Sequence, residues 1–181
     1  RVRLAGKEVT IKSTDRALRL GIGLLPESRK TQGLVLPFSV KDNIWLNKHA
    51  CQFSLIRDNE ERLTAERLIS HVGVKTPDAG TAVGTLSGGN QQKVVISRWL
   101  NHDVNILIFD EPTRGIDVGA KSEIYQIMRD LTAQGISIIM ISSELPEVIG
   151  VSDRVMVFRD GNIVAELESD QINSTVIMLH A

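Results

Sequence analysis

Residues 104–113 read VNILIFDEPT, and they follow the stretch LSGGNQQ at residues 86–92. Positions 104–109 form a nearly continuous apolar run, interrupted only by Asn105, which is typical of a parallel strand buried on both faces. Asp110 and Glu111 come at the carboxyl end of that run, where open α/β sheets bind their ligands. This stretch therefore predicts an α/β fold with a candidate site at one strand end.

The glycine-containing stretch at 86–92 predicts the start of a helix near Gly88, with Ser87 as its cap. The N-terminus of a helix carries unpaired N–H groups and a partial positive charge, which suit phosphate oxygens. Gly88 and Gly89 lack a Cβ and would let a ligand approach the backbone closely. The alternative is an ordinary capped helix after a turn.

The two adjacent acids admit a plain interpretation as well as a chemical one. Neighbouring strand residues point to opposite faces, so Asp110 and Glu111 are expected to have different roles. Alternatively, the pair caps a helix and Pro112 marks a simple strand exit. The occurrence of both blocks, followed by Gly-Ile-Asp at residues 115–117, favours the chemical interpretation.

The order and spacing of these three blocks resemble the ATP-binding cassette (ABC) ATPases, with a signature motif, a Walker B strand and a D-loop in turn. The resemblance implies ATP and Mg²⁺ as cofactors, with Asp110 holding the metal and Glu111 orienting or deprotonating the attacking water. It implies that the nucleotide is contacted by Ser87, Gly88, Gly89, Asn90, Gln91 and Asp117.

Composition limits the class of protein. The chain has 181 residues, 42% hydrophobic and 24% charged, as expected of one globular domain. A formal net charge of −1 gives no reason to expect nucleic acid as a partner. The single Cys51 excludes an internal disulfide. The longest apolar stretch, residues 136–141, is far shorter than the roughly 20 residues that span a bilayer. Any link to a membrane must therefore run through a partner.

Periodicity and turn residues predict alternating strands and helices, as in α/β folds. A polar loop is expected over 26–37, and the helix over 58–72 is expected to turn Leu63, Leu68, Ile69 and Val72 inward. Gly135 is expected to end the helix before it. We expect strands over 2–4, 8–11, 21–25, 104–109, 136–142, 154–159 and 162–167, and helices over 15–20, 39–48, 58–72, 87–101, 118–133, 144–149 and 170–179.

The resemblance covers essentially the whole chain and implies a partial nucleotide-binding domain over residues 1–181. Its parallel-sheet core would comprise 1–38 and 102–181, with a helical subdomain at about 39–101. The phosphate loop that such an ATPase needs, Gly-x-x-x-x-Gly-Lys-Ser/Thr, does not occur. In the family that loop precedes the region matching Val2. We therefore expect a C-terminal piece of a longer protein that does not hydrolyse ATP by itself.

Two positions depart from the family pattern. Glu27 stands where members usually carry a glutamine; a carboxylate could still ligate Mg²⁺, and Gln32 is a rival candidate. Ser143 stands where members place a switch histidine, and it would share the catalytic role with Glu111. A serine can hydrogen-bond to a phosphate but supplies no imidazolium. The chain's histidines do not fit the slot and are expected at the surface or in packing: His49, His71, His102 and His180.

The strings PESRK (26–30), GLV (33–35), LSGGNQQK (86–93), TRGID (113–117) and SSELPEV (142–148) resemble the second cassette of bacterial monosaccharide importers of the ribose, galactose and xylose type. The resemblance implies head-to-tail pairing with a first cassette of the same polypeptide or a second copy. It also implies an integral membrane permease and, indirectly, a periplasmic sugar-binding protein as partners. The location would be peripheral, at the cytoplasmic face of the inner membrane.

In such a pair, the start of the signature helix would complete the first cassette's ATP site. Asp110, Glu111 and Ser143 would belong to this cassette's own site. One alternative is a soluble ABC ATPase acting on ribosomes or DNA, but residues 114–117 read Arg-Gly-Ile-Asp rather than Asn-His-Leu-Asp, and no sustained heptads occur. Another is a regulatory cassette with little turnover, because Glu27 and Ser143 depart from the pattern.

Overall fold

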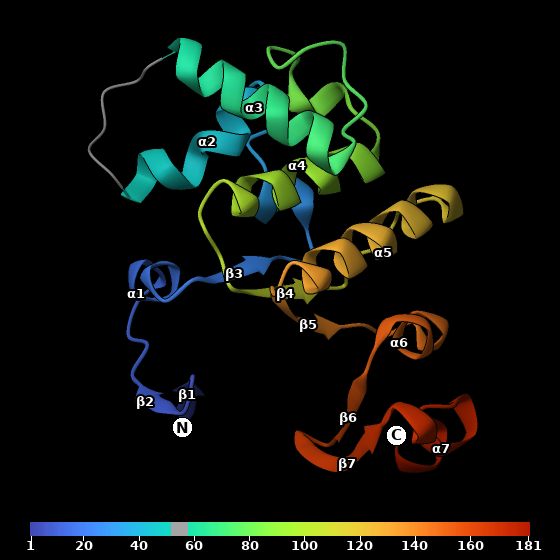
Figure 1. The fold of residues 1–181 in the computed structure, drawn as a ribbon. Coiled ribbons are helices and arrows are strands. Elements are labelled where there is room, and N and C mark those ends of the chain that lie inside the picture. The colour runs from blue at the N-terminus through green and yellow to red at the C-terminus, as the bar shows by residue number, and fades with distance from the viewer. Residues whose placement is uncertain (52–57) are drawn as a thin grey trace. The chain divides into compact units, whose positions relative to one another are not determined.

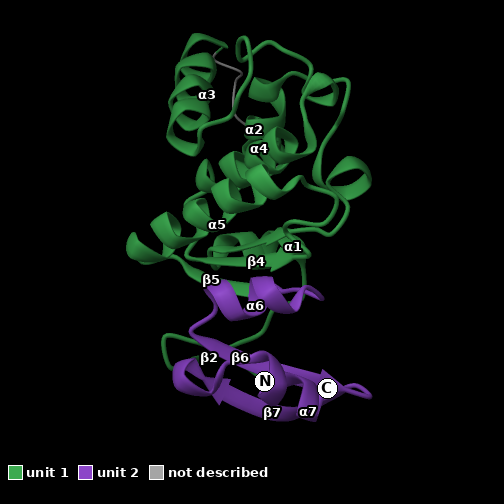
Figure 2. Ribbon diagram, turned by 90° about the vertical axis from the view of Figure 1, so that its right-hand side faces the viewer, with its two compact units in different colours: residues 1–139 green, residues 140–181 purple. Residues whose placement is uncertain are grey.

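The computed structural model describes residues 1–51 and 58–181 (Figure 1). The chain divides into two compact units, residues 1–139 and 140–181 (Figure 2). The predicted helical subdomain, about 39–101, lies within the first unit, and its residues 52–57 lie outside the described part. The division of that unit into core and helical subdomain remains a prediction.

Nearly all of the sheet that carries the predicted site lies in the first unit; only the last two residues of its third strand belong to the second. Strands β3 (Ile22–Leu25), β4 (Ile106–Asp110) and β5 (Ser137–Ile141) follow one another in the order β3-β4-β5. β3 and β4 run parallel, with Leu25 opposite Phe109. The expected α/β class with a parallel sheet is confirmed.

The strands are less enclosed than their apolar sequences predict. In β4, Leu107 and Phe109 are fully buried, whereas the alternate residues are only half-buried. The expectation of burial on both faces was therefore wrong. In β5, Ile139 and Ile141 are 53% and 51% exposed although the strand is apolar. Ile139 and Ile141 are alternate residues and so lie on the same face of β5, which the described residues leave largely uncovered.

Helices pack over this sheet (Figure 1). α4 (Gly88–Leu100) lies against β3, and α2 (Val40–Cys51) and α3 (Asp58–Val72) pack on α4. α5 (Val118–Ala133) lies beside α4. The ranges expected for α3 and α5 are confirmed, and Gly135, with φ of +90°, follows α5 as expected.

The inward face of α3 agrees with the expected one except at Leu63, since Leu68 and Ile69 are half-buried. Leu63 is 56% exposed, so its predicted inward position was wrong, whereas Val72 is buried as expected. Glu61 is buried in its place, with its carboxylate 3.0 Å from the ring Nε2 of His49. An apolar stripe alone did not indicate this, because the partner that permits Glu61 to be buried lies on another helix.

A close approach between β3 and α4 depends on glycine. A Cβ placed on Gly23 would lie 2.7 Å from the Trp99 ring and 2.9 Å from Leu107. At the far side of α4, the guanidinium of Arg98 is buried and its Nε donates to the carbonyl oxygen of Asn43 at 2.8 Å. Burial lowers the pKa of Arg98 to about 10, so the group is charged at neutral pH.

The remaining elements of the first unit are short. β1 (Val2–Leu4) and β2 (Lys7–Val9) pair antiparallel, and α1 (Thr14–Arg19) leads into β3. The expected loop after β3 contains a π-helical turn, η1 (Arg29–Gly33), which sequence patterns did not predict. A 3₁₀ turn, η2 (Val83–Thr85), precedes α4.

The second unit is a hairpin with two helices. β6 (Arg154–Arg159) and β7 (Asn162–Glu168) pair antiparallel, and the turn Asp160-Gly161 has φ of +50° and +76°, as an Asp-Gly hairpin requires. α6 is Leu145–Val151, η3 is Ser169–Gln171 and α7 is Ser174–His180. The helix expected from 170 starts later because Asn173 caps it.

Within the described residues, no helix combines the length and the apolar character needed to cross a membrane.

Candidate functional site

The parallel pairing of β3 and β4 brings two predicted residues to the same edge of the sheet. Leu25 and Phe109 are opposite one another near the strand ends. Glu27 follows two residues after Leu25, and Asp110 follows directly after Phe109. The chain therefore leaves both strands at the carboxyl edge, where ligands bind in open α/β sheets.

Glu111 has an unusual backbone for its residue type. Its φ is +47°, in the left-handed region that non-glycine residues rarely adopt. Its carbonyl accepts from the backbone N–H of Arg114 at 3.2 Å, which closes a tight turn directly after β4. Such conformations cost on the order of 1–3 kcal/mol and cluster at functional sites. This strain is a second observation, beside residue type, that marks Glu111.

Glu27 has a partner within the chain. Its carboxylate forms an ion pair with the guanidinium of Arg114, and both side chains are largely exposed. The carboxylate predicted to ligate Mg²⁺ is therefore engaged by a cation in this structure. A metal role for Glu27 requires this pair to open, and exposed pairs of this kind contribute only about 0–1 kcal/mol.

Arg29 makes hydrogen bonds to the backbone of residues 114–115. Its Nη1 donates to the carbonyl oxygen of Arg114 at 3.0 Å, and its Nη2 donates to that of Gly115 at 3.2 Å. Burial lowers the pKa of Arg29. The sequence analysis assigned no role to Arg29 or Arg114. The signal available was the presence of both arginines in the charged strings that flank the predicted acids.

The start of α4 is organised by side chains rather than by a simple cap. Ser87 is the N-cap residue, but its side chain makes no capping bond to the helix backbone. Its Oγ instead accepts from the Asn90 amide at 3.0 Å, and the Asn90 side-chain oxygen accepts from the backbone N–H of Lys75 at 2.8 Å. Since a hydroxyl has one hydrogen, Ser87 keeps its O–H as the group that can donate to a ligand.

The two glycines of this stretch are required by packing within the chain. A Cβ on Gly88 would lie 2.6 Å from Nη2 of Arg29, and a Cβ on Gly89 would lie 2.6 Å from Cβ of Ala120. The structure therefore supplies a reason for glycine at 88 and 89 that does not involve a ligand. Their predicted contact with a nucleotide stays a prediction.

Two further predicted residues make hydrogen bonds that stabilise the local structure of this chain. Gln91 is buried, and its amide donates to the carbonyl oxygen of Leu86 at 3.1 Å, which shapes the turn before α4. Asp117 is the N-cap of α5 and accepts from the backbone N–H of Ala120 at 2.9 Å. Both contacts are compatible with a supporting part in a site.

Ser143 belongs to the second unit and is exposed between β5 and α6. The adjacent Ser142 makes local contacts that begin α6. Its Oγ accepts from the backbone N–H of Glu144 at 3.0 Å and donates to the Glu147 carboxylate at 2.6 Å. The predicted catalytic role of Ser143 stays a prediction.

The carboxylates fit a metal ion that takes some of its ligands from the protein and the others from a substrate. The described residues hold no group of three or more histidines, cysteines or acids that could bind a metal by themselves. Mg²⁺ usually takes one or two carboxylates together with phosphate oxygens and waters. Asp110, at the end of β4, fits that pattern, and Glu27 fits it only when Arg114 is released.

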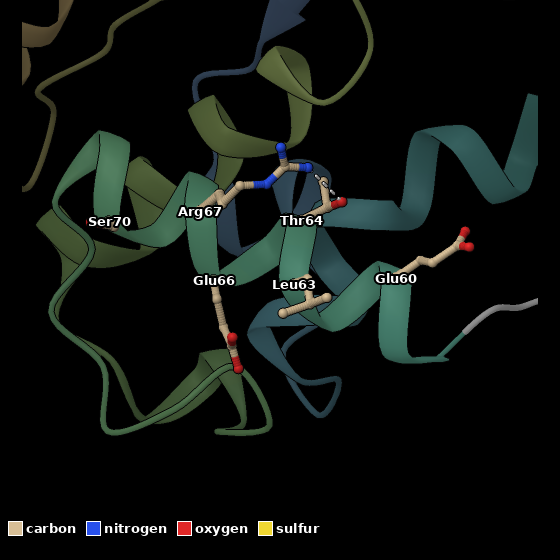
Figure 3. Close-up of a pocket in the computed structure, with 6 residues that line it drawn as sticks. All are labelled: Glu60, Leu63, Thr64, Glu66, Arg67 and Ser70. Atoms are coloured by element: carbon tan, nitrogen blue, oxygen red, sulfur yellow. Dashed lines mark hydrogen bonds between the residues drawn. The ribbon is translucent and has the colours of Figure 1, made fainter.

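A hollow of about 290 Å³ borders this site and is lined by Glu27, Ser28, Arg29, Lys30 and Arg114. A larger, open hollow of about 740 Å³ lies along α3 (Figure 3). Its lining residues all come from that helix and include no predicted site residue: Glu60, Leu63, Thr64, Glu66, Arg67 and Ser70. We therefore place the candidate site at the strand ends.

Comparison with known proteins gives a family match and close relatives. A family model described as "ABC transporter" matches residues 1–114. The chain is 62% identical over 183 residues to the "Ribose import ATP-binding protein RbsA" of Hahella chejuensis (strain KCTC 2396), covering 99% of this chain and 36% of that protein. It is 48% identical over 181 residues to a protein of the same name from Oceanobacillus iheyensis (strain DSM 14371), covering 98% of this chain and 36% of that protein. The chain thus spans about a third of the length of these relatives.

Solved structures show the same fold at low identity. A nucleotide-free ATP-binding cassette from an ABC transporter superposes with a TM-score of 0.79 and 21% identity, covering 97% of this chain and 74% of that one. A dimeric ATP-binding cassette in a post-hydrolysis state, bound to ADP and Pi, superposes with a TM-score of 0.72 and 19% identity, covering 88% and 68% of the two chains.

Proposed function

The chain belongs to the ABC transporter family, and from that premise we propose that it is part of an ATP-hydrolysing subunit of a sugar importer. The observation that carries the proposal is a strand end bearing Asp110 and Glu111, in a chain 62% identical to a ribose import ATP-binding protein. ATP-driven closure of two cassettes would be passed to a membrane permease.

We infer a role for each of these residues from its position. Asp110, at the carboxyl edge of the sheet, holds the magnesium ion of the nucleotide, which when bound withdraws charge from the phosphates. Glu111 orients the attacking water and accepts its proton. Its left-handed backbone sets the direction of that side chain. Glu27 would become a second ligand of this ion once its ion pair with Arg114 opens.

The start of α4 serves the opposing cassette. Ser87 donates its O–H to a phosphate oxygen, and Asn90 holds the hydroxyl in place for that contact. The backbone N–H groups at Gly88 and Gly89 add the partial positive charge of a helix start. Gln91 and Asp117 support the two helix starts on which these contacts depend.

We propose as partners a first cassette of the same polypeptide or a second copy, an integral membrane permease and, through it, a periplasmic sugar-binding protein. The location is peripheral, at the cytoplasmic face of the inner membrane. The relatives described above are import ATP-binding proteins. We therefore set aside the alternative of a ribosome- or DNA-associated ATPase.

The test is Glu111→Gln in the complete polypeptide that carries this chain. The amide keeps the shape and removes the base, so turnover at this cassette's own site should fall by about 10²–10⁴-fold with ATP affinity retained. Glu8→Gln, an exposed strand residue, is the matched control and should leave turnover unchanged. Loss of nucleotide affinity with normal single-turnover chemistry would contradict the assignment.

The isolated chain of 181 residues should release no phosphate from ATP, because it holds no phosphate loop to bind the nucleotide. Phosphate release by the purified chain that is abolished by Glu111→Gln would overturn this expectation.

A further inference from the structure

The guanidinium of Arg29 lies where three segments of the first unit meet. Its own segment is η1, in which the carbonyl of Ser28 accepts from both Gln32 N–H at 2.9 Å and Gly33 N–H at 3.2 Å. This π-helical turn follows β3, and η1 packs on α4. π-turns are rare and recur at functional sites.

The side chain reaches from this turn to the two other segments. Its two terminal nitrogens donate to consecutive carbonyls, Arg114 O at 3.0 Å and Gly115 O at 3.2 Å. On the other side, the space that a Cβ on Gly88 would fill lies 2.6 Å from Nη2. A charged donor to two carbonyls makes stronger bonds than a neutral one, and a planar fork suits adjacent acceptors.

We propose that Arg29 is a positioning residue, which holds the 114–115 backbone against the start of α4 so that the loop after β3, the turn after β4 and residues 87–91 move as one body. The inference rests on the proposed function, in which those segments face nucleotide. Glu27 strengthens the link from the same loop, since its carboxylate pairs with the side chain of Arg114.

The geometry also assigns a reason for glycine at position 88. The atoms nearest to a Cβ there are the tip of Arg29, with Nη2 at 2.6 Å and Cζ at 3.3 Å, whereas the carbonyl oxygen of Gly115 lies at an ordinary 3.5 Å. The tip of a long side chain moves more easily than backbone. Gly88→Ala therefore displaces the guanidinium and breaks the same two hydrogen bonds that Arg29→Ala removes.

The test is a double-variant cycle in the complete polypeptide, without nucleotide, read by hydrogen exchange at the amides of residues 114–120. Arg29→Ala and Gly88→Ala should each speed exchange by about tenfold, the order expected when a charge-assisted hydrogen bond is lost. The double variant should exchange no faster than either single one. Lys30→Ala, an exposed neighbour in the same turn, is the matched control and should exchange as the parent does.

Additive effects, approaching a hundredfold in the double variant, would overturn the proposal, because independent sites add. So would Arg29→Ala exchanging like Lys30→Ala. Arg29→Lys keeps the charge and can still reach one carbonyl, so it should restore part of the protection; exchange as slow as in the parent would contradict the need for the fork geometry. These readings need no ATP and stand even if the proposed activity fails.

A second measurement separates positioning from general weakening of the fold. In ATP hydrolysis by the complete polypeptide, Arg29→Ala should lower kcat by about tenfold and change KM for ATP less than twofold, since an interaction needed for arrangement and not for binding affects mainly kcat. An unchanged kcat together with faster exchange would overturn the positioning role.

Discussion

Replacing Glu123 with glutamine should destabilise the first unit in a pH-dependent manner. Glu123, on α5, accepts from Lys93 at Oε2, 2.7 Å away, and from Lys75 at Oε1, 2.9 Å away. The Lys93 side chain is 5% exposed, and its second acceptor is the carbonyl of Gly73 at 2.7 Å. Glu123→Gln leaves this buried ammonium with a neutral partner in place of a charged one.

The magnitude follows from the burial of the three groups. Breaking a fully buried ion pair costs about 3–5 kcal/mol. Glu123 is 41% exposed and Gly73 still accepts, so the loss at pH 7 should be about 1–2 kcal/mol after allowing for solvent screening. The Lys75 side chain is 74% exposed, so Lys75→Met should cost less than about 0.5 kcal/mol.

The pH dependence has a definite sign. The hydrogen bond from Lys93, and then that from Lys75, hold the pKa of Glu123 below its usual value. The stabilisation is therefore present above the unfolded pKa, about 4.3, and is lost as the pH falls through the lower folded pKa. The difference between parent and Glu123→Gln should be constant near neutral pH and vanish in acid.

The assay is urea unfolding followed by tryptophan fluorescence, since Trp45 and Trp99 both lie in the first unit. Lys75→Met is the control. Equal losses in Lys75→Met and Glu123→Gln would refute the assignment of the effect to the buried lysine. A difference that persists unchanged in acid would refute its electrostatic origin.

Three further outcomes are expected. Gly23→Ala should cost about 1–3 kcal/mol by overpacking against Trp99, and an unchanged urea midpoint would refute that contact. Asp117→Ala should cost about 1 kcal/mol by removing the cap of α5, whereas Asp117→Asn should retain most of it; equal losses would point away from capping. Ser143→His should raise ATP turnover at this cassette's own site, measured with the first cassette's catalytic glutamate replaced, since a donor aimed at developing charge is worth on the order of 3 kcal/mol. An unchanged rate with a lower Tm would favour a purely structural Ser143.

Local patterns predicted the elements well where each residue's role depends on near neighbours. The ranges of α3 and α5 agree with the structure because their periodicity extends over four turns. The hairpin at Asp160-Gly161 follows from its turn residues alone. The position of Asp110 at a strand end follows from the apolar run before it.

The patterns did not predict contacts made between distant segments. The burial of Glu61 depends on His49 in another helix, and the ion pair of Glu27 depends on Arg114, which lies far along the chain. The exposure of Ile139 depends on which segments pack on its face of β5. None of these partners lies within the window that periodicity covers, so the candidate acids could be predicted and their neighbours could not.

The shared space between Arg29 and position 88 constrains how this sequence can change over evolutionary time. One small volume holds either a guanidinium or a methyl group, and not both. A mutation that adds a side chain at 88 is therefore tolerated only after position 29 has become smaller, whereas shortening 29 first removes the support for the 114–115 backbone. Each single step passes through a less organised intermediate, so we expect the two positions to change together or to stay as they are.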